Sequence, residues 1–151
     1  PFANATFEQL FDGERLADAY YRKITNLASG YAIQGAGGSF TFHPFPRRAQ
    51  ISPLFALLAA DADADGELEI IAGGNWHGVR PALGRYDASL GVVLDEQEGG
   101  WKALPPRTTG LSLLGECRGL QVIRPTAASL WLLAARNDDS PQLFRFPAVP
   151  Q

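Results

Sequence analysis

The sequence has no methionine, a single cysteine and only two histidines among its 151 residues. The lone cysteine, Cys117, excludes a disulfide bond within the chain, and its apolar neighbours predict a buried thiol rather than a reactive one. A zinc site needs several Cys or His ligands, and this chain offers too few of them. The lack of methionine, together with Pro1 as the first residue, leads us to expect a processed chain or a fragment.

Basic residues are too few and too scattered for a nucleic-acid-binding protein. Thirteen Lys and Arg residues stand against sixteen Asp and Glu residues, which gives a net charge of −3, whereas nucleic acid is bound by a basic stripe. No apolar run approaches the roughly 20 residues that span a bilayer, and no signal peptide is recognisable. Because 46% of the residues are apolar, we expect a soluble globular chain with its own core.

The most informative stretch is DADADGELEII, residues 61–71. It carries acidic residues at alternate positions around a glycine that permits a sharp turn: Asp61, Asp63, Asp65, Gly66, Glu67 and Glu69. Carboxylate oxygens, with the backbone carbonyl of Glu67, form the oxygen cage that calcium prefers. An EF-hand is excluded, because its twelfth position needs a bidentate glutamate and here holds Ala72. We therefore predict a calcium-binding β-hairpin; the alternative is a solvated acidic turn.

The rest of the chain predicts an all-β protein with a helical start. After about residue 28, short runs rich in branched and aromatic residues alternate with Gly, Pro and Asp turns. From Thr6 to Lys23, in contrast, apolar residues recur at steps of three and four, with an interruption at Asp12 and Gly13. This pattern predicts two short helices.

Three segments repeat a strand that has an aromatic residue near its start and a proline at its end: Gly38 to Pro46, Gly100 to Pro106 and Gln142 to Pro147. Further strands are expected ahead of them at Ser29 to Gln34, Phe55 to Ala60, Leu68 to Ala72, Ser89 to Leu94, Gly119 to Ile123 and Leu130 to Ala135. Four antiparallel strands per unit are typical of a β-propeller blade.

The repeats predict about two and a half blades, because the first unit supplies only its last two strands. We divide the chain into a helical insertion (1–27), a half blade (28–50), a calcium-loop blade (51–106) and a degenerate terminal blade (107–151). A propeller needs at least about four blades to close. We therefore expect the remaining blades to come from the same parent chain or from another chain.

The acidic hairpin and the segments after it resemble the FG-GAP/VCBS repeat propellers. The resemblance rests on DADADGELEIIAGGN, GRYDASLGVVL, a Gly-Trp strand, GLSLLGECRGLQVI and LLAARNDD, and it extends from Ala28 to Phe146. It is closest to the bacterial extracellular kind that is often found beside ASPIC/UnbV domains. The helical opening, which ends in LASGYAIQ, fits an insertion seen in such proteins.

The resemblance implies a blade stapled by calcium, with ligands at Asp61, Asp63, Asp65, Glu67 and Glu69. Two departures from the family pattern bear on the count of sites. Glu69 stands where the family usually has Asp, and the corresponding hairpin of the next blade, residues 124–129, has no acidic residue. We therefore expect one calcium ion. Since calcium is abundant outside the cytosol, we expect an extracellular, periplasmic or cell-surface location.

The loop from Asn75 to Tyr86 is the main candidate for ligand binding. Its candidate residues combine aromatic rings with basic groups: Trp76, His77, Arg80, Arg85 and Tyr86. Such side chains suit a sugar or a protein surface, and long loops often carry binding function. In the alternative interpretation, Trp76 and Tyr86 pack the loop onto neighbouring blades and Arg85 pairs with Asp87.

We find no residue set that supports catalysis. His77, Asp87 and Ser89 lack a G-x-S-x-G elbow, and residues 35–38 (GAGG) lack the lysine and helix of a phosphate loop. We therefore expect a non-enzymatic calcium-binding module within a secreted or cell-surface assembly. Its role is either structural or the binding of a protein or a glycan. The alternative is the non-catalytic part of a larger propeller-containing hydrolase or lyase.

Overall fold

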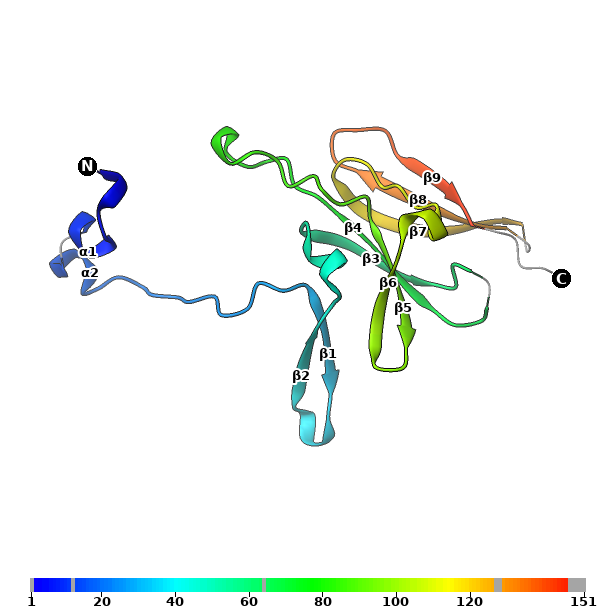
Figure 1. Cartoon of the computed structure of the whole chain (residues 1–151), viewed down its shortest axis with the longest axis horizontal. Coiled ribbons are helices and arrows are strands. Elements are labelled where there is room, and N and C mark those ends of the chain that lie inside the picture. Colours follow the sequence, from blue (N-terminus) through cyan, green and yellow to red (C-terminus); the bar gives the residue numbers. More distant parts are fainter. Residues whose placement is uncertain (1, 12, 64, 127–128, 147–151) are drawn as a thin grey trace.

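Three antiparallel sheets and a few single-turn helices make up the computed structural model (Figure 1). It describes residues 2–11, 13–63, 65–126 and 129–146. The helical turns are η1 (Phe2–Asn4), α1 (Phe7–Leu10), α2 (Gly13–Leu16), η2 (Ala36–Gly38), η3 (Arg47–Gln50), η4 (Pro81–Leu83) and α3 (Pro106–Thr109). The strands are β1 (Gly30–Gln34), β2 (Phe40–Pro44), β3 (Leu54–Ala60), β4 (Glu69–Gly74), β5 (Val92–Gln97), β6 (Gly100–Leu104), β7 (Cys117–Thr126), β8 (Ser129–Arg136) and β9 (Gln142–Arg145).

Strand pairing follows chain order in every sheet. β1 pairs with β2, the central sheet has the order β3-β4-β5-β6, and the third sheet has the order β7-β8-β9. The all-β prediction is confirmed. The propeller stays a prediction, because the described part of the chain holds three open sheets of two, four and three strands and no closed ring of blades. Pro147, which ends the third predicted repeat, and residues 127–128 lie outside the described residues.

One predicted strand begins later than expected. The sequence predicts a strand from Ser89, but β5 begins at Val92. Gly91 has a φ of 81°, which is incompatible with a strand, and Ser89 is buried in contact with another loop. The strand therefore starts only after this turn.

The β3–β6 sheet lies between the other two sheets and is apolar on both faces. Because successive side chains of a strand point to opposite faces, Ile71 and Val93 join the core shared with the β7–β9 sheet, which includes Leu132. Ala72 and Leu94 join the core shared with the β1–β2 sheet. Full burial of a Leu or Ile side chain contributes about 1.5–3 kcal/mol. These two cores hold the three sheets in one stack.

Cys117 lies in the first of these cores, as predicted for a core thiol. Burial raises the pKa of the thiol, while the Gly119 carbonyl and the charge of Arg118 act in the opposite direction. A raised thiol pKa lowers the thiolate fraction at neutral pH, so this cysteine is a packing residue.

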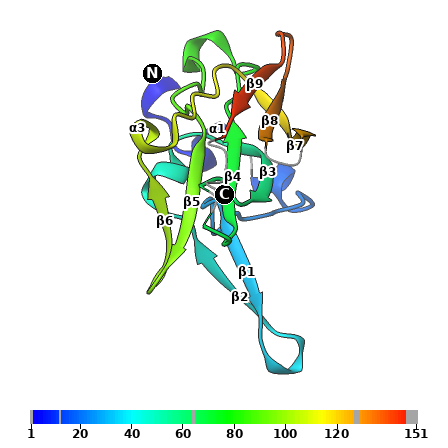
Figure 2. The same ribbon diagram turned by 90° about the vertical axis from the view of Figure 1, so that its right-hand side faces the viewer.

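The base of the β1–β2 sheet is closed by the Gln50 side chain. Its Nε2 donates to the carbonyl oxygens of Ser29 at 2.7 Å and Phe45 at 2.9 Å, and its Oε1 accepts from the Ser29 N–H at 2.8 Å. Further along, the Tyr31 ring lies 6.4 Å from the Trp101 ring of β6. One face of this sheet is thereby docked, while its tip projects away from the stack (Figure 2).

The amino-terminal part of the chain lies apart from the sheets (Figure 1). Two helices lie in the predicted range, α1 and α2, each four residues long, but α2 ends at Leu16 and the helical pattern predicted up to Lys23 is not continued. Helices this short are marginal without tertiary packing. Residues 19–29 have neither helix nor strand, and Tyr20, Tyr21, Ile24 and Leu27 are exposed along them.

Candidate functional site

The acidic hairpin joins β3 to β4 beyond the last residue pair of their ladder. Carboxylate oxygens of Asp61, Asp63 and Asp65 all lie within 4.8 Å of one another. The N–H of Asp65 donates to Asp63 at 3.3 Å, that of Gly66 to Asp61 at 3.2 Å, and that of Glu67 to Asp65 at 2.8 Å. Gly66 has a φ of 94°, which favours glycine. The backbone of the loop therefore holds the three carboxylates together.

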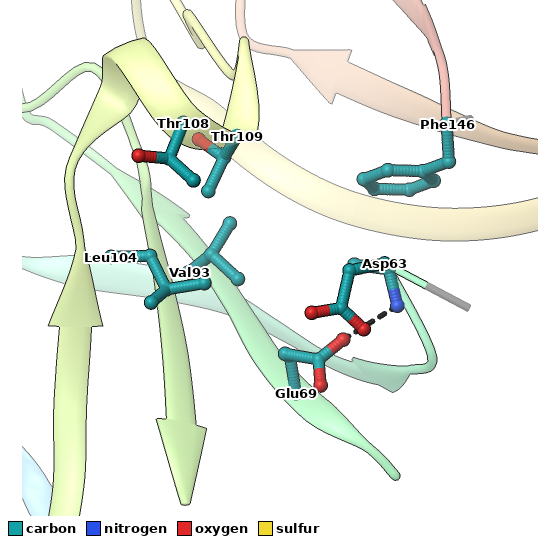
Figure 3. Close-up of a pocket in the computed structure, with 8 residues that line it drawn as sticks. Asp63, Glu69, Val93, Leu104, Thr108, Thr109 and Phe146 are labelled. Carbon is teal, nitrogen blue, oxygen red and sulfur yellow. Dashed lines mark hydrogen bonds between the residues drawn. The ribbon is translucent and has the colours of Figure 1, made fainter. Parts of the chain in front are cut away.

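Glu69 approaches this loop from the first position of β4 and is only 2% exposed. One of its carboxylate oxygens accepts a 2.6 Å hydrogen bond from the Ala62 N–H (Figure 3). Burial raises the pKa of the Glu69 carboxyl, the Ala62 N–H opposes that rise, and the neighbouring aspartate charges add to it. A cation held by the aspartates would favour the ionised form of Glu69.

The structure brings together three of the five predicted ligands. The group within 4.8 Å does not include Glu67 or Glu69. The Glu67 side chain is exposed and lines an open pocket with Leu68, Asp95 and Glu96. Its predicted role uses the backbone carbonyl, so the direction of its side chain does not bear on that role.

A cavity of about 90 Å³ lies next to the acidic hairpin, between the central sheet and Phe146 (Figure 3). Its lining is apolar except for two carboxylates and two hydroxyls: Ala62, Asp63, Glu69, Val93, Leu104, Thr108, Thr109 and Phe146. It is large enough to admit water, which needs about 10–15 Å³ of such volume. It is smaller than the roughly 300–1,000 Å³ typical of pockets for organic ligands.

The loop from Asn75 to Tyr86 forms a two-stranded arm. Trp76 and Tyr86 exchange backbone hydrogen bonds of 2.8 and 2.9 Å, and Ser52 Oγ donates to the Tyr86 carbonyl oxygen at 3.0 Å. The side chains of Trp76 and Tyr86 are 44% and 47% exposed, and Arg80 and Arg85 are also exposed. The backbones of the two aromatic residues are thus held within the fold, as the interpretation of the loop as a packing element predicts. Their rings remain half-exposed.

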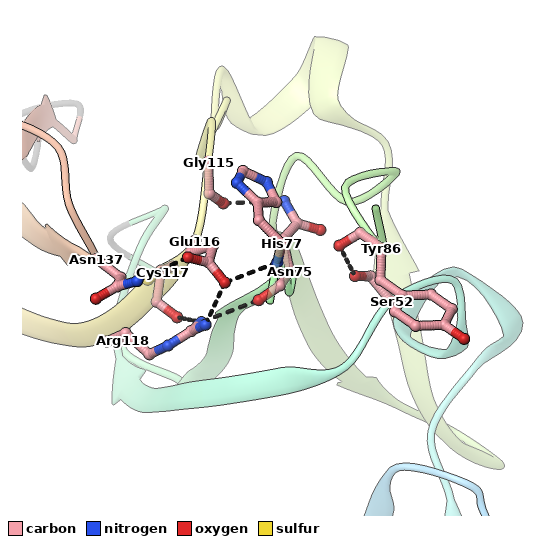
Figure 4. A network of polar contacts seen from close by, with 9 residues as sticks. All are labelled: Ser52, Asn75, His77, Tyr86, Gly115, Glu116, Cys117, Arg118 and Asn137. Carbon is pink, nitrogen blue, oxygen red and sulfur yellow. Dashed lines mark hydrogen bonds and ion pairs between the residues drawn. The ribbon is translucent and has the colours of Figure 1, made fainter. Parts of the chain in front are cut away.

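A buried polar network anchors the base of this arm (Figure 4). Asn75, which follows β4, has a φ of 74° and is 2% exposed. Its Nδ2 donates to the carbonyl oxygens of Ser89 at 2.8 Å and Gly115 at 3.0 Å, and its Oδ1 accepts from the Ser89 N–H at 3.1 Å. Asn75 thus joins both ends of the arm to the segment that precedes β7.

Glu116 is the second centre of the network (Figure 4). Its Oε1 accepts from the His77 N–H at 2.8 Å and from the Arg118 guanidinium at 2.7 Å, and its Oε2 accepts from Asn137 Nδ2 at 2.8 Å. The Asn137 amide and the His77 N–H lower the pKa of Glu116, and the charge of Arg118 adds to this effect against the opposing effect of burial. The carboxylate therefore connects the arm to both β7 and the end of β8.

His77 joins this network through its backbone. Its Nε2 is buried and has no hydrogen-bond partner within the part of the chain that the structure describes. Ser89 is also buried, and its Oγ accepts from the Gly91 N–H at 3.1 Å. Among the described residues, Ser89 makes no hydrogen bond with His77 or Asp87, so its hydroxyl stabilises a turn.

Sequence reasoning missed Asn75, Glu116 and Arg118. Two signals point to them. Asn75 follows two glycines at the end of an apolar strand, which is a common place for a left-handed residue. Glu116 and Arg118 are two residues apart in an otherwise apolar run, and residues at that spacing lie on one face of a strand.

Comparison with protein-family models, with curated proteins and with solved structures finds no match for this chain. In the ranges that the structure describes, no helix combines the length and the apolar character needed to cross a membrane.

Proposed function

We propose that this chain is a calcium-binding structural module, a segment of an FG-GAP/VCBS-like β-propeller in a secreted or cell-surface assembly. The observation that carries the proposal is the group of Asp61, Asp63 and Asp65, whose carboxylate oxygens lie within 4.8 Å of one another. Calcium prefers oxygen ligands and accepts six to eight of them in flexible geometry. The Glu67 carbonyl and water molecules would complete the shell.

The position of the loop supports a structural role. It joins β3 to β4, and β4, like β5, sends side chains into both cores of the stack. A cation that binds only the folded hairpin stabilises it by about 2.7 kcal/mol when free calcium is a hundred times the dissociation constant. The stacking of three chain-ordered antiparallel sheets supports the blade interpretation.

Calcium titration by calorimetry, with thermal unfolding in parallel, tests this function. We expect saturable binding near one ion per chain and a raised Tm in the native protein, and loss of both effects in Asp63→Ala. Glu98→Ala is the matched control, because it removes one exposed carboxylate at the β5–β6 turn and leaves the hairpin intact. Absence of saturable binding, or equal binding by Asp63→Ala, would refute the proposal.

A second function, contact with a protein or a glycan, is supported by the arm. Trp76 and Tyr86 carry half-exposed rings on backbone positions that are hydrogen-bonded to each other. Rigid aromatic side chains give contact area at low entropic cost. Quenching of tryptophan fluorescence by oligosaccharides, compared between the native chain and Trp76→Phe, tests this role. Quenching that is equal in both proteins would count against it.

A further inference from the structure

The turn of the acidic hairpin contains an Asp–Gly peptide bond, Asp65–Gly66. Both residues are exposed, and a Cβ added at Gly66 would meet nothing within 4 Å. An aspartate side chain can close a five-membered ring onto the backbone nitrogen of the next residue. Glycine hinders this ring closure least, because it has no side chain and its backbone is the most adaptable. The Asp65 side chain and the Gly66 nitrogen are therefore the two reacting groups of a ring closure for which the turn leaves room.

The Gly66 nitrogen directs its proton at a carboxylate. Its N–H donates to Asp61 Oδ2 at 3.2 Å. Ring closure onto Cγ of Asp65 has to remove this proton, because the product is an uncharged imide. A general base for such a step lies within about 2.6–3.2 Å of the atom that carries the proton. The Asp61 carboxylate lies at the outer end of that range and can take the proton directly.

A second backbone group acts on the carboxyl that is attacked. The Glu67 N–H donates to Asp65 Oδ1 at 2.8 Å. Attack on Cγ places negative charge on a carboxyl oxygen, and a donor about 2.7–3.1 Å from that oxygen stabilises the charge. The same hydrogen bond holds the Asp65 side chain against the turn that contains the Gly66 nitrogen. Less conformational freedom is then lost when the ring closes.

We propose that Asp65 is a site of isoaspartate formation and that the loop promotes the reaction. The Gly66 nitrogen forms a bond to Cγ of the Asp65 carboxylic acid and gives its proton to Asp61. The Asp65 hydroxyl takes a proton from Asp61 and leaves as water. One water molecule then opens the cyclic imide by breaking the bond between the Gly66 nitrogen and the main-chain carbonyl carbon of Asp65. The water lost is regained, so the product is an isomer and no oxidant or cofactor is needed.

The product changes the geometry of the hairpin. The chain now runs through the side chain of residue 65, which adds one methylene group to the backbone and leaves the free carboxylate attached directly to Cα. The normal backbone holds the carboxylates of Asp61, Asp63 and Asp65 within 4.8 Å of one another. Isoaspartate formation therefore disrupts the group proposed to bind calcium. The reaction itself does not rest on that function.

The full chain and a peptide of residues 58–72, which lacks the fold, provide the first comparison. Both are incubated in excess EDTA at neutral pH, and isoaspartate is quantified over several weeks by peptide mapping with electron-transfer dissociation. We expect residue 65 to react at least about tenfold faster in the folded chain than in the peptide, which is less than the roughly 10²–10⁴-fold effect of a positioned base in an enzyme.

Asp61→Asn and Asp63→Asn separate the base from the general charge of the loop. Each variant removes one carboxylate, but only Asp61 accepts from the Gly66 N–H, whereas Asp63 accepts from the Asp65 N–H at 3.3 Å. Asp61→Asn should slow the reaction at least about tenfold, and Asp63→Asn should slow it less. Asp65→Glu should remove the isoaspartate signal, because its longer side chain would have to close a six-membered ring.

Three results would overturn the proposal: no isoaspartate at residue 65, a rate in the folded chain no higher than in the peptide, or equal slowing by Asp61→Asn and Asp63→Asn. Thermal unfolding shows that each variant is folded before its rate is compared. Because calcium is absent throughout, the outcome is independent of the calcium titration, and either proposal can fail without the other.

Discussion

Replacing Asn75 with alanine measures how strongly the buried network holds the arm to the sheets. The change removes three side-chain hydrogen bonds of 2.8–3.1 Å, each contributing about 0.5–1.5 kcal/mol. Alanine at a φ of 74° adds a backbone cost of about 1–2 kcal/mol. The free energy of unfolding should therefore fall by about 3–6 kcal/mol, a large part of the roughly 5–15 kcal/mol that stabilises a domain.

Urea denaturation followed by tryptophan fluorescence provides the assay. Asn75→Gly separates the two contributions, because glycine accepts the positive φ and lacks the side chain; it should be about 1–2 kcal/mol more stable than Asn75→Ala. Asn26→Ala, at an exposed asparagine, should change stability by less than about 0.5 kcal/mol. A loss below about 1 kcal/mol for Asn75→Ala would refute the reasoning.

Two further predictions concern the same region. The pKa of Glu116 is lowered in the folded state from its ordinary value of 4.5, so its contribution to stability is complete above that value and is lost as pH falls below it. In urea denaturation at several pH values, the native protein should lose its higher midpoint relative to Glu116→Gln as the pH is lowered. A difference in midpoint that stays constant with pH would contradict this prediction. Gly74→Ala should cost more than about 3 kcal/mol, because a Cβ would lie 1.7 Å from the Pro53 carbonyl oxygen. Gly13→Ala is the control, because nothing lies within 4 Å of the added Cβ. Thermal unfolding measures both variants, and an equal change in Tm would contradict the steric argument.

The strands could be predicted because their signal is local. The apolar run of β3, LFALLAA, and the apolar residues of β4 are visible in the sequence, and such short runs bounded by turn residues predict strands. The start of β5 could not be predicted in the same way. It depends on the turn at Gly91 and on the contact between Ser89 and Asn75, which lies 14 residues away.

The difference between local and long-range contacts also explains which candidate site could be predicted. The aspartate group was predictable because its members lie within five residues and share one loop, so spacing alone brings them together. The partners of Glu116 are 39 and 21 residues away, at His77 and Asn137. No short motif encodes contacts of that separation, and they become visible only when the sheets are stacked.

The order of the sheets in space has a kinetic consequence. Each sheet is built from one continuous stretch of chain, 30–44, 54–104 or 117–145, so its ladders close short loops and form early. Among the described residues, the central sheet shares one core with each of the two outer sheets. Stability in such a one-dimensional array is a sum of unit and nearest-neighbour terms. Unfolding therefore spreads inward from the two outer sheets, and the β3–β6 sheet, which carries the acidic hairpin, is the last part of the molecule to open.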